Sequence, residues 1–238
     1  MIQVGDIPIL FEDAEALVID KPAGVSVDRP RKGGPCLEDH WEHLKLGFQR
    51  PPSAVHRLDT DTTGCLLLAR NPKALKRLAR AFEERLVEKR YLGVVAGPLT
   101  QDEGTIELSL AKISSAEKGW RMIAARKGKP SVTHWRVVER LEGRTLVEFR
   151  PETGRTHQIR IHAEAGLGFP LLGDPIYGPE KGRGKGAPRT MLHAAGLVVP
   201  REKKDLIQAA APMPKDFLAL GFADPGESAE RVPEAHDG

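Results

Sequence analysis

Short apolar runs, separated by polar or glycine-containing turns, recur along most of the chain. Runs of this length that are rich in Val, Ile, Leu and Thr are typical of strands. Several of them follow one another too closely for a crossover helix, which favours antiparallel neighbours in one mixed sheet. The expected strands are Ala16–Asp20, Gly64–Ala69, Tyr91–Ala96, Thr105–Leu110, Val132–Val138, Thr145–Phe149 and Gly196–Val199.

Two segments carry a helical pattern instead. The first runs from Pro72 to about Glu88, where Asn71 can cap the helix and Pro72 suits its first position. Its apolar stripe comprises Leu75, Leu78, Ala79, Phe82 and Leu86. The second is expected from Thr156 to Ala165 and ends at Gly166, a favourable residue after a helix. These elements predict an α+β domain with a large mixed, mainly antiparallel sheet flanked by helices.

The composition suits a globular protein of enzyme size. The chain has 238 residues, of which 40% are hydrophobic. The N-terminal sequence MIQVGDIPILFED lacks the features of a signal peptide, and no run approaches the roughly 18 apolar residues of a membrane helix. The two cysteines, Cys36 and Cys65, fit a reducing compartment better than a disulfide scaffold. We therefore expect a cytoplasmic protein with no membrane partner.

Charge is distributed unevenly along the chain. From Asp205 to the end there are two basic and seven acidic residues, a net of −5, so the overall +3 leaves +8 for residues 1–204. We expect one folded domain over residues 1–222 and an acidic, disordered tail over residues 223–238. Residues 178–189 hold four basic side chains and four glycines, which predicts a mobile surface loop. A basic body suits a polyanionic partner, although basic proteins that bind no nucleic acid also exist.

The sequence HRLDTDTTG, from His56 to Gly64, concentrates titratable groups and hydroxyls directly before an apolar run. In one interpretation, Asp59 and Asp61 only cap a turn. However, Leu58 and the apolar run that follows favour burial of this loop, and a buried carboxylate needs a partner.

A partner for this carboxylate is available in PETGRTHQIRIHAEAG, residues 151–166. Arg160 stands between two isoleucines, and a guanidinium held in apolar surroundings would keep a nearby carboxylate ionised. The Arg160 side chain could instead reach solvent or form an ion pair with Glu164. His157 and His162 are five residues apart, which does not align them on a helix face, so no metal site is expected.

A tyrosine opens the expected strand in EKRYLGVVAG, residues 88–97. Tyr91 is one of only two tyrosines in the chain. It could serve a reaction centre, or it could simply anchor the end of the strand.

In combination, these stretches resemble the signature sequences of pseudouridine synthases of the RluA/RsuA type, whose loop is usually written HRLD-x-x-T-S-G. The resemblance covers roughly residues 8–220 in the family's order. It includes Lys21-Pro22-Ala23-Gly24, Lys89-Arg90-Tyr91 with Gly97, Thr153 to Arg160, Gly173-Asp174-Pro175 with Tyr177-Gly178, and Leu192-His193-Ala194. Thr63 replaces the usual serine, and the S4-like RNA-binding domain of many relatives is missing from this sequence.

The resemblance implies a catalytic domain with a central basic cleft and assigns roles to individual residues. Asp59 matches the essential aspartate, Tyr91 the active-site tyrosine, and Arg160 the basic partner of the aspartate. Arg57 matches an arginine that can enter the RNA stack, and Leu192 a residue that lines the base pocket. The other expected substrate-binding residues are His56, Thr62, Gly64, Arg155, Thr156, His157 and Gln158.

The implied activity is isomerisation of uridine to pseudouridine in structured ribosomal or transfer RNA. The base would flip out, and an aspartate-dependent step would move C1′ from N1 to C5. The product is an isomer, so we expect no cofactor and no metal, and we expect a monomer. The basic body alone would also suit a non-catalytic RNA-binding protein or RNA chaperone, and the carboxylate would also suit a nucleoside hydrolase or base glycosylase.

Overall fold

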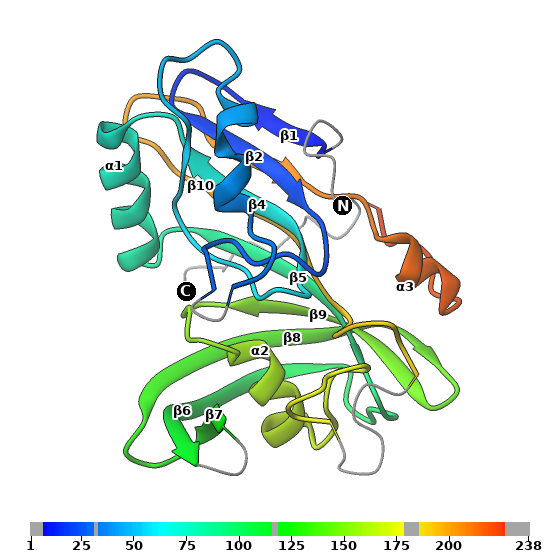
Figure 1. Ribbon diagram of the computed structural model, residues 1–238. Helices are drawn as coiled ribbons and strands as arrows, with labels where there is room; N and C mark the ends of the chain where they lie inside the picture. The colour runs from blue at the N-terminus through cyan, green and yellow to red at the C-terminus, as the bar shows by residue number, and fades with distance from the viewer. Residues whose placement is uncertain (1–6, 31–32, 116–118, 179–185, 227–238) are drawn as a thin grey trace, which may run out of the picture.

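A single mixed sheet organises the part of the chain that the computed structural model describes, namely residues 7–30, 33–115, 119–178 and 186–226 (Figure 1). Its strands are β1 (Ile9–Glu12), β2 (Ala16–Lys21), β3 (Ser53–Ala54), β4 (Thr63–Ala69), β5 (Glu88–Val95), β6 (Glu103–Ser115), β7 (Gly119–Ala124), β8 (Lys129–Leu141), β9 (Arg144–Pro151), β10 (Leu192–Val199) and β11 (Ile207–Ala210). The order across the sheet is β1-β2-β4-β10-β5-β9-β8-β6-β7, with β3 paired to β4 and β11 paired to β10.

Every strand pair within the described ranges is antiparallel except β4 with β10, which is parallel. The predicted mixed, mainly antiparallel sheet is therefore confirmed. Each expected strand overlaps an observed one, whereas β1, β3, β7 and β11 were not predicted. Both β1 and β7 are edge strands in which no residue is buried.

The helices are few, and the longest is α1 (Pro72–Glu83). As expected, the Asn71 side chain caps it by accepting a hydrogen bond from the Ala74 N–H at 2.8 Å. The predicted end near Glu88 was wrong, because Arg85 adopts φ 60° and breaks the helix. Leu86 is consequently 52% exposed and does not belong to the apolar stripe.

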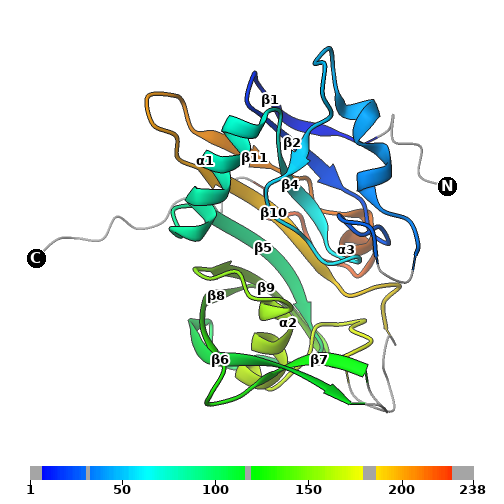
Figure 2. The same cartoon turned by 60° about the vertical axis from the view of Figure 1, so that its left-hand side comes forward.

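The second helix, α2 (Gln158–Ile161), begins two residues later than predicted, because His157 adopts the left-handed conformation with φ 54°. A π-helical turn (His162–Gly166) continues it as far as the expected glycine. In Figures 1 and 2, α2 lies against the half of the sheet that contains β6 to β9. The remaining helices are a 3-10 helix (Leu37–Leu44) and α3 (Lys215–Ala219).

The core lies on both sides of β4, all seven residues of which are buried. Cys65 and Leu67 pack with Leu78 of α1, and Leu66 and Leu68 pack in a second cluster on the other face. Both cysteines are buried and unpaired. Because β4 is covered on both faces, its first residues have a fixed position. The loop that leads into them in HRLDTDTTG is therefore anchored at this end.

Some expectations fall on residues outside the description. Residues 227–238, which make up most of the expected acidic tail, and residues 179–185 of the expected surface loop are not described. At the end of that loop, however, Arg189 is buried rather than at the surface. In the described segments, no helix combines the length and apolarity needed to cross a bilayer.

A close backbone approach joins β4 to β10 at Gly64. Its φ is +103°, and a Cβ atom there would lie 2.2 Å from the carbonyl oxygen of Ala194. Gly64→Ala should therefore lower the free energy of unfolding by at least about 3 kcal/mol, because both the φ angle and the strand contact must change. Urea denaturation followed by circular dichroism measures this loss.

Gly143→Ala provides the matched control. Gly143 also has a positive φ, +72°, but a Cβ there would meet nothing within 4 Å. Its expected loss is only about 1–2 kcal/mol from the backbone conformation. Equal losses of unfolding free energy for the two variants would show that the close contact of Gly64 with Ala194 adds nothing to the cost of the substitution.

Candidate active site

The loop that carries Asp59 lies between β3 and β4 and is held by a buried lysine. Lys21 is 0% exposed, and its ammonium donates to the carbonyl oxygens of Pro22 at 2.8 Å, Val25 at 2.7 Å and Thr60 at 3.0 Å. Burial lowers the pKa of Lys21 to about 8, so it is mainly protonated at neutral pH. Its three N–H donors then meet three carbonyls, one of them next to Asp59.

A buried arginine holds the same loop from the other side. The Arg189 guanidinium donates to the carbonyl oxygens of Asp61 at 2.9 Å and Leu192 at 3.0 Å. It also makes two hydrogen bonds to the Asp216 carboxylate of α3, at 2.7 and 3.0 Å. The loop, the start of β10 and α3 are thus fixed relative to one another.

Asp59 and Arg160 come together although they are 101 residues apart in sequence. Arg160 Nη1 donates to Asp59 Oδ2 at 3.2 Å. The other edge of the guanidinium makes a bidentate pair with Asp174, with Nε to Oδ2 at 2.7 Å and Nη2 to Oδ1 at 2.8 Å. Asp174 also accepts from the backbone N–H groups of Ile176 and Tyr177. One guanidinium therefore bridges two carboxylates.

Burial separates the roles of the two carboxylates. The side chain of Asp174 is 0% exposed, whereas that of Asp59 is 31% exposed. Burial alone would raise the pKa of Asp174, but the hydrogen bonds and charge of Arg160 lower it below its usual value. Burial alone would lower the pKa of Arg160, but the hydrogen bonds and charges of Asp174 and Asp59 raise it above the usual range. Asp174 is thus the fixed counterion, and Asp59 is the carboxylate that an incoming molecule can reach.

An imidazole and a phenol complete this cluster. His157 Nδ1 lies 2.8 Å from the Tyr177 hydroxyl, and its Nε2 lies 3.9 Å from Asp59 Oδ2. Burial lowers the pKa of His157, so the ring is neutral at pH 7. The Tyr177 hydroxyl accepts from the Met122 N–H at 3.1 Å and can donate to His157 Nδ1. This arrangement favours the tautomer that directs an Nε2–H towards Asp59.

Tyr91 and Leu192 belong to the apolar cluster next to this carboxylate. Tyr91 of β5 stands opposite Phe149 of β9, and Leu192 of β10 packs in the same cluster. Burial and the negative charge of Asp59 raise the pKa of Tyr91 above its usual value near 10, so its phenol is protonated at neutral pH.

Other residues expected to contact substrate point towards solvent. The Arg57 side chain is 77% exposed and forms an ion pair with Asp28 at 3.5 Å. Thr156 is exposed, and Arg155 Nε donates to the carbonyl oxygen of Pro130 at 3.3 Å.

Four of the expected substrate residues make internal contacts instead. The N–H of Leu67 donates to His56 Nε2 at 3.0 Å, and burial lowers the pKa of His56 to about 3. Gln158 uses its whole amide: Oε1 accepts from Thr153 Oγ1 and the Arg155 N–H, and Nε2 donates to Val132 O and Thr133 Oγ1. Thr62 is 2% exposed, and Gly64 lies against β10. These contacts favour positioning roles for all four.

The residues described include no group of three His, Cys, Asp or Glu side chains placed to hold a metal ion. In particular, His162 lies apart from His157, with its Nε2 2.8 Å from Ser131 Oγ in the core.

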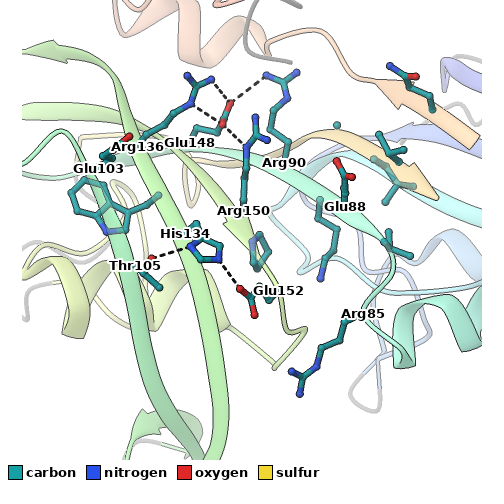
Figure 3. Close-up of a pocket in the computed structure, with 18 of the residues that line it drawn as sticks. Arg85, Glu88, Arg90, Glu103, Thr105, His134, Arg136, Glu148, Arg150 and Glu152 are labelled. Carbon is teal, nitrogen blue, oxygen red and sulfur yellow. Dashed lines mark hydrogen bonds and ion pairs between the residues drawn. The ribbon is translucent and has the colours of Figure 1, made fainter. Parts of the chain in front are cut away.

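A hollow of about 1000 Å³ lies on the other face of the sheet (Figure 3). Glu148 and Arg150 flank Phe149 in β9, so their side chains point away from Tyr91. In this hollow Glu148 Oε1 accepts hydrogen bonds from Arg136 Nε at 2.9 Å and from Arg150 Nε at 2.8 Å. His134 lies between Thr105 and Glu152, as Figure 3 shows. These charges bind one another, and Asp59 does not line this hollow, so the candidate site is at Asp59.

Sequence reasoning missed several residues that build the site. Asp174 and Tyr177 stand in the motif GDPIYG, and Lys21 stands in KPAG, so a signal was present for each. These motifs do not show by themselves which residue pairs with Arg160 or holds the loop, because those contacts join segments that are distant in sequence. Arg189 carried no comparable signal, since its glycine-rich surroundings suggested a surface loop.

Comparisons with known proteins agree with this geometry. The family model for RNA pseudouridylate synthase matches residues 15–165. The chain is 53% identical over 214 residues to an uncharacterized RNA pseudouridine synthase of Zymomonas mobilis, covering 90% of this chain and 97% of that protein. It is 38% identical over 223 residues to ribosomal large subunit pseudouridine synthase D of Nitrosomonas europaea, covering 89% of this chain and 63% of that protein.

A solved structure shows the same architecture. Human RNA pseudouridylate synthase domain containing 1 aligns with a TM-score of 0.73 at 30% identity, covering 89% of this chain and 85% of that chain. The match of the family model over more than half of the chain, together with these identities, settles the family. The chain belongs to the RluA-type RNA pseudouridine synthases, isomerases that convert uridine in RNA to pseudouridine.

Proposed function

We propose that Asp59 is the catalytic carboxylate of this pseudouridine synthase and that it acts on a uridine flipped out of a structured RNA. The observation that carries this proposal is the asymmetric bridge at Arg160. One end of the bridge is the buried Asp174, and the other is the partly exposed Asp59, 3.2 Å from Arg160 Nη1. The bridge orients a carboxylate that stays partly exposed, which is what a nucleophile or an electrostatic stabiliser requires.

The reaction breaks the bond between ribose C1′ and uracil N1, turns the base and joins C1′ to C5. The proton on C5 leaves at the end and N1, released from C1′, gains one, so atoms and electrons balance without an oxidant or reductant. Asp59 can attack C1′, attack C6 of the base, or assist elimination to a glycal. All three routes use the same carboxylate, and the hydrogen bond from Arg160 orients it.

Base flipping explains the apolar surface beside the carboxylate. We propose that Tyr91 and Leu192 pack against the extruded uracil, since both belong to the cluster next to Asp59. Stacking on an aromatic ring contributes about 1–3 kcal/mol per base. Arg57 is exposed on the same loop as Asp59 and can fill the space that the base leaves in the RNA.

Large-subunit ribosomal RNA is the first substrate to test, with transfer RNA as the alternative. Several relatives, including those of Nitrosomonas europaea and Haemophilus ducreyi, are named ribosomal large subunit pseudouridine synthase D. The assay is release of tritium to water from RNA that carries [5-³H]uridine and lacks this modification. Mapping of pseudouridines with and without the gene then identifies the position.

Asp59→Asn should reduce tritium release at least about a thousandfold, because the amide is neither a nucleophile nor an anion. Its affinity for RNA should stay within a few-fold of wild type, since the side chain keeps its size. Asp102→Asn is the control, because it removes an 84% exposed carboxylate that pairs only with Arg140 among its described contacts. Full tritium release by Asp59→Asn would refute the proposal.

Arg160→Lys should lower kcat about a hundredfold while the protein stays folded. Lysine keeps the positive charge but cannot bind Asp174 through two N–H groups and reach Asp59 at the same time. The measurement is single-turnover tritium release at saturating protein, with circular dichroism as the check on folding. Arg140→Lys, on an exposed pair with Asp102, is the matched control and should leave kcat unchanged. Equal rates for the two variants would mean that the guanidinium does not orient Asp59.

A further inference from the structure

The strands β6 and β7 place an exposed tryptophan next to the candidate active site. Trp120 of β7 is 47% exposed, whereas Trp135 is 6% exposed and Trp41 is partly buried. An exposed indole is unusual on a surface that needs only to be soluble. Figure 2 shows β7 beside α2, the helix that begins directly after His157.

The register of the two strands defines the surface around this ring. Trp120 stands opposite Ser114, and Met122 stands opposite Lys112, so these four side chains share one face. The edge of β7 is held near the site, because the Met122 backbone N–H donates to the Tyr177 hydroxyl. The Trp120 ring lies 5.2 Å from the His157 ring at an angle of 31°.

His157 connects this ring to the catalytic carboxylate. Its Nε2 lies 3.9 Å from Asp59 Oδ2, so a single imidazole separates Trp120 from Asp59. The indole is therefore close enough to Asp59 to contact a nucleotide next to one that is bound there. On the same face, Lys112 Nζ lies 5.0 Å above the centre of the Trp120 ring. The surface thus combines an aromatic ring with an exposed cation.

We propose that Trp120 is a stacking platform for an unpaired base of the substrate RNA, next to the target uridine, and that Lys112 binds the phosphate of that nucleotide. The inference rests on the proposed function, since it takes RNA as the molecule that enters at Asp59. Exposed aromatic rings beside cations are the usual means of holding single-stranded nucleic acid, because every base has a face that stacks.

This role has a consequence for the choice of substrate. Stacking tolerates any base but requires that the base be free of its helix. The enzyme should therefore select uridines whose neighbour is also unpaired, as in a loop or bulge. Trp120 would contribute to binding of the RNA rather than to bond breaking, which distinguishes it from Asp59 and Arg160.

The test measures KM and kcat of the full chain with [5-³H]uridine-labelled total RNA from cells that lack the gene. Trp120→Ala should raise KM between about fivefold and a hundredfold and leave kcat within about twofold. Trp120→Phe keeps a ring and should lose much less affinity. Lys112→Gln should raise KM and reduce the salt dependence of binding by about one phosphate contact. Leu206→Ala, which removes another exposed apolar side chain, should change neither constant.

A second measurement is independent of turnover. Unlabelled RNA of the same preparation should quench the tryptophan fluorescence of the wild-type protein, and the quench should shrink in Trp120→Phe. An unchanged quench in that variant would overturn the inference. So would a Trp120→Ala protein that loses kcat at an unchanged KM, because the indole would then only support His157. Wild-type protein that releases no tritium would instead refute the proposed function, so the two failures are distinguishable.

Discussion

The sharing of one buried guanidinium between two carboxylates is the interaction on which the site depends. An isolated buried guanidinium would be costly, and Asp174 removes most of that cost by a bidentate pair inside the protein. The remaining N–H is then free to hold Asp59 at 3.2 Å. Without Asp174, Asp59 would be the only carboxylate that the structure places on this guanidinium in the described residues. The buried acid is therefore what leaves the exposed acid available for chemistry.

The segment directly after Asp59 is held through its backbone carbonyl groups. Lys21 donates to the carbonyl oxygen of Thr60, and Arg189 donates to that of Asp61, so cations hold the chain directly after the carboxylate. Both cations are buried, and hydrogen bonds in surroundings of such low polarity are electrostatically stronger than in water. The close approach of Gly64 to β10 completes the support. The Asp59 side chain is thus left free of structural duties on its own loop.

Local sequence patterns predicted the elements that depend on local physics. The apolar runs located the strands, and Asn71 located the start of α1, because strand burial and helix capping are written in neighbouring residues. The start of α2 was missed because His157 adopts a left-handed conformation that its residue type does not demand. Asp174 was missed as the main partner of Arg160 because that pairing is set by the fold. The exposed β7 has no apolar alternation, so neither the strand nor the position of Trp120 could be predicted.

Tyr177 links β7 to the cluster of side chains around Asp59. Its hydroxyl accepts from the Met122 N–H of β7 and contacts His157 Nδ1, and its ring lies 5.1 Å from the Arg160 guanidinium. Its own backbone N–H donates to Asp174. A displacement of β7 by bound RNA would therefore act on the imidazole, the guanidinium and the buried acid through one side chain. Since each of these groups is buried and already bonded, small movements cannot be absorbed locally and must alter the surroundings of Asp59. The proposed base platform and the proposed catalytic carboxylate are therefore linked through the contacts of Tyr177.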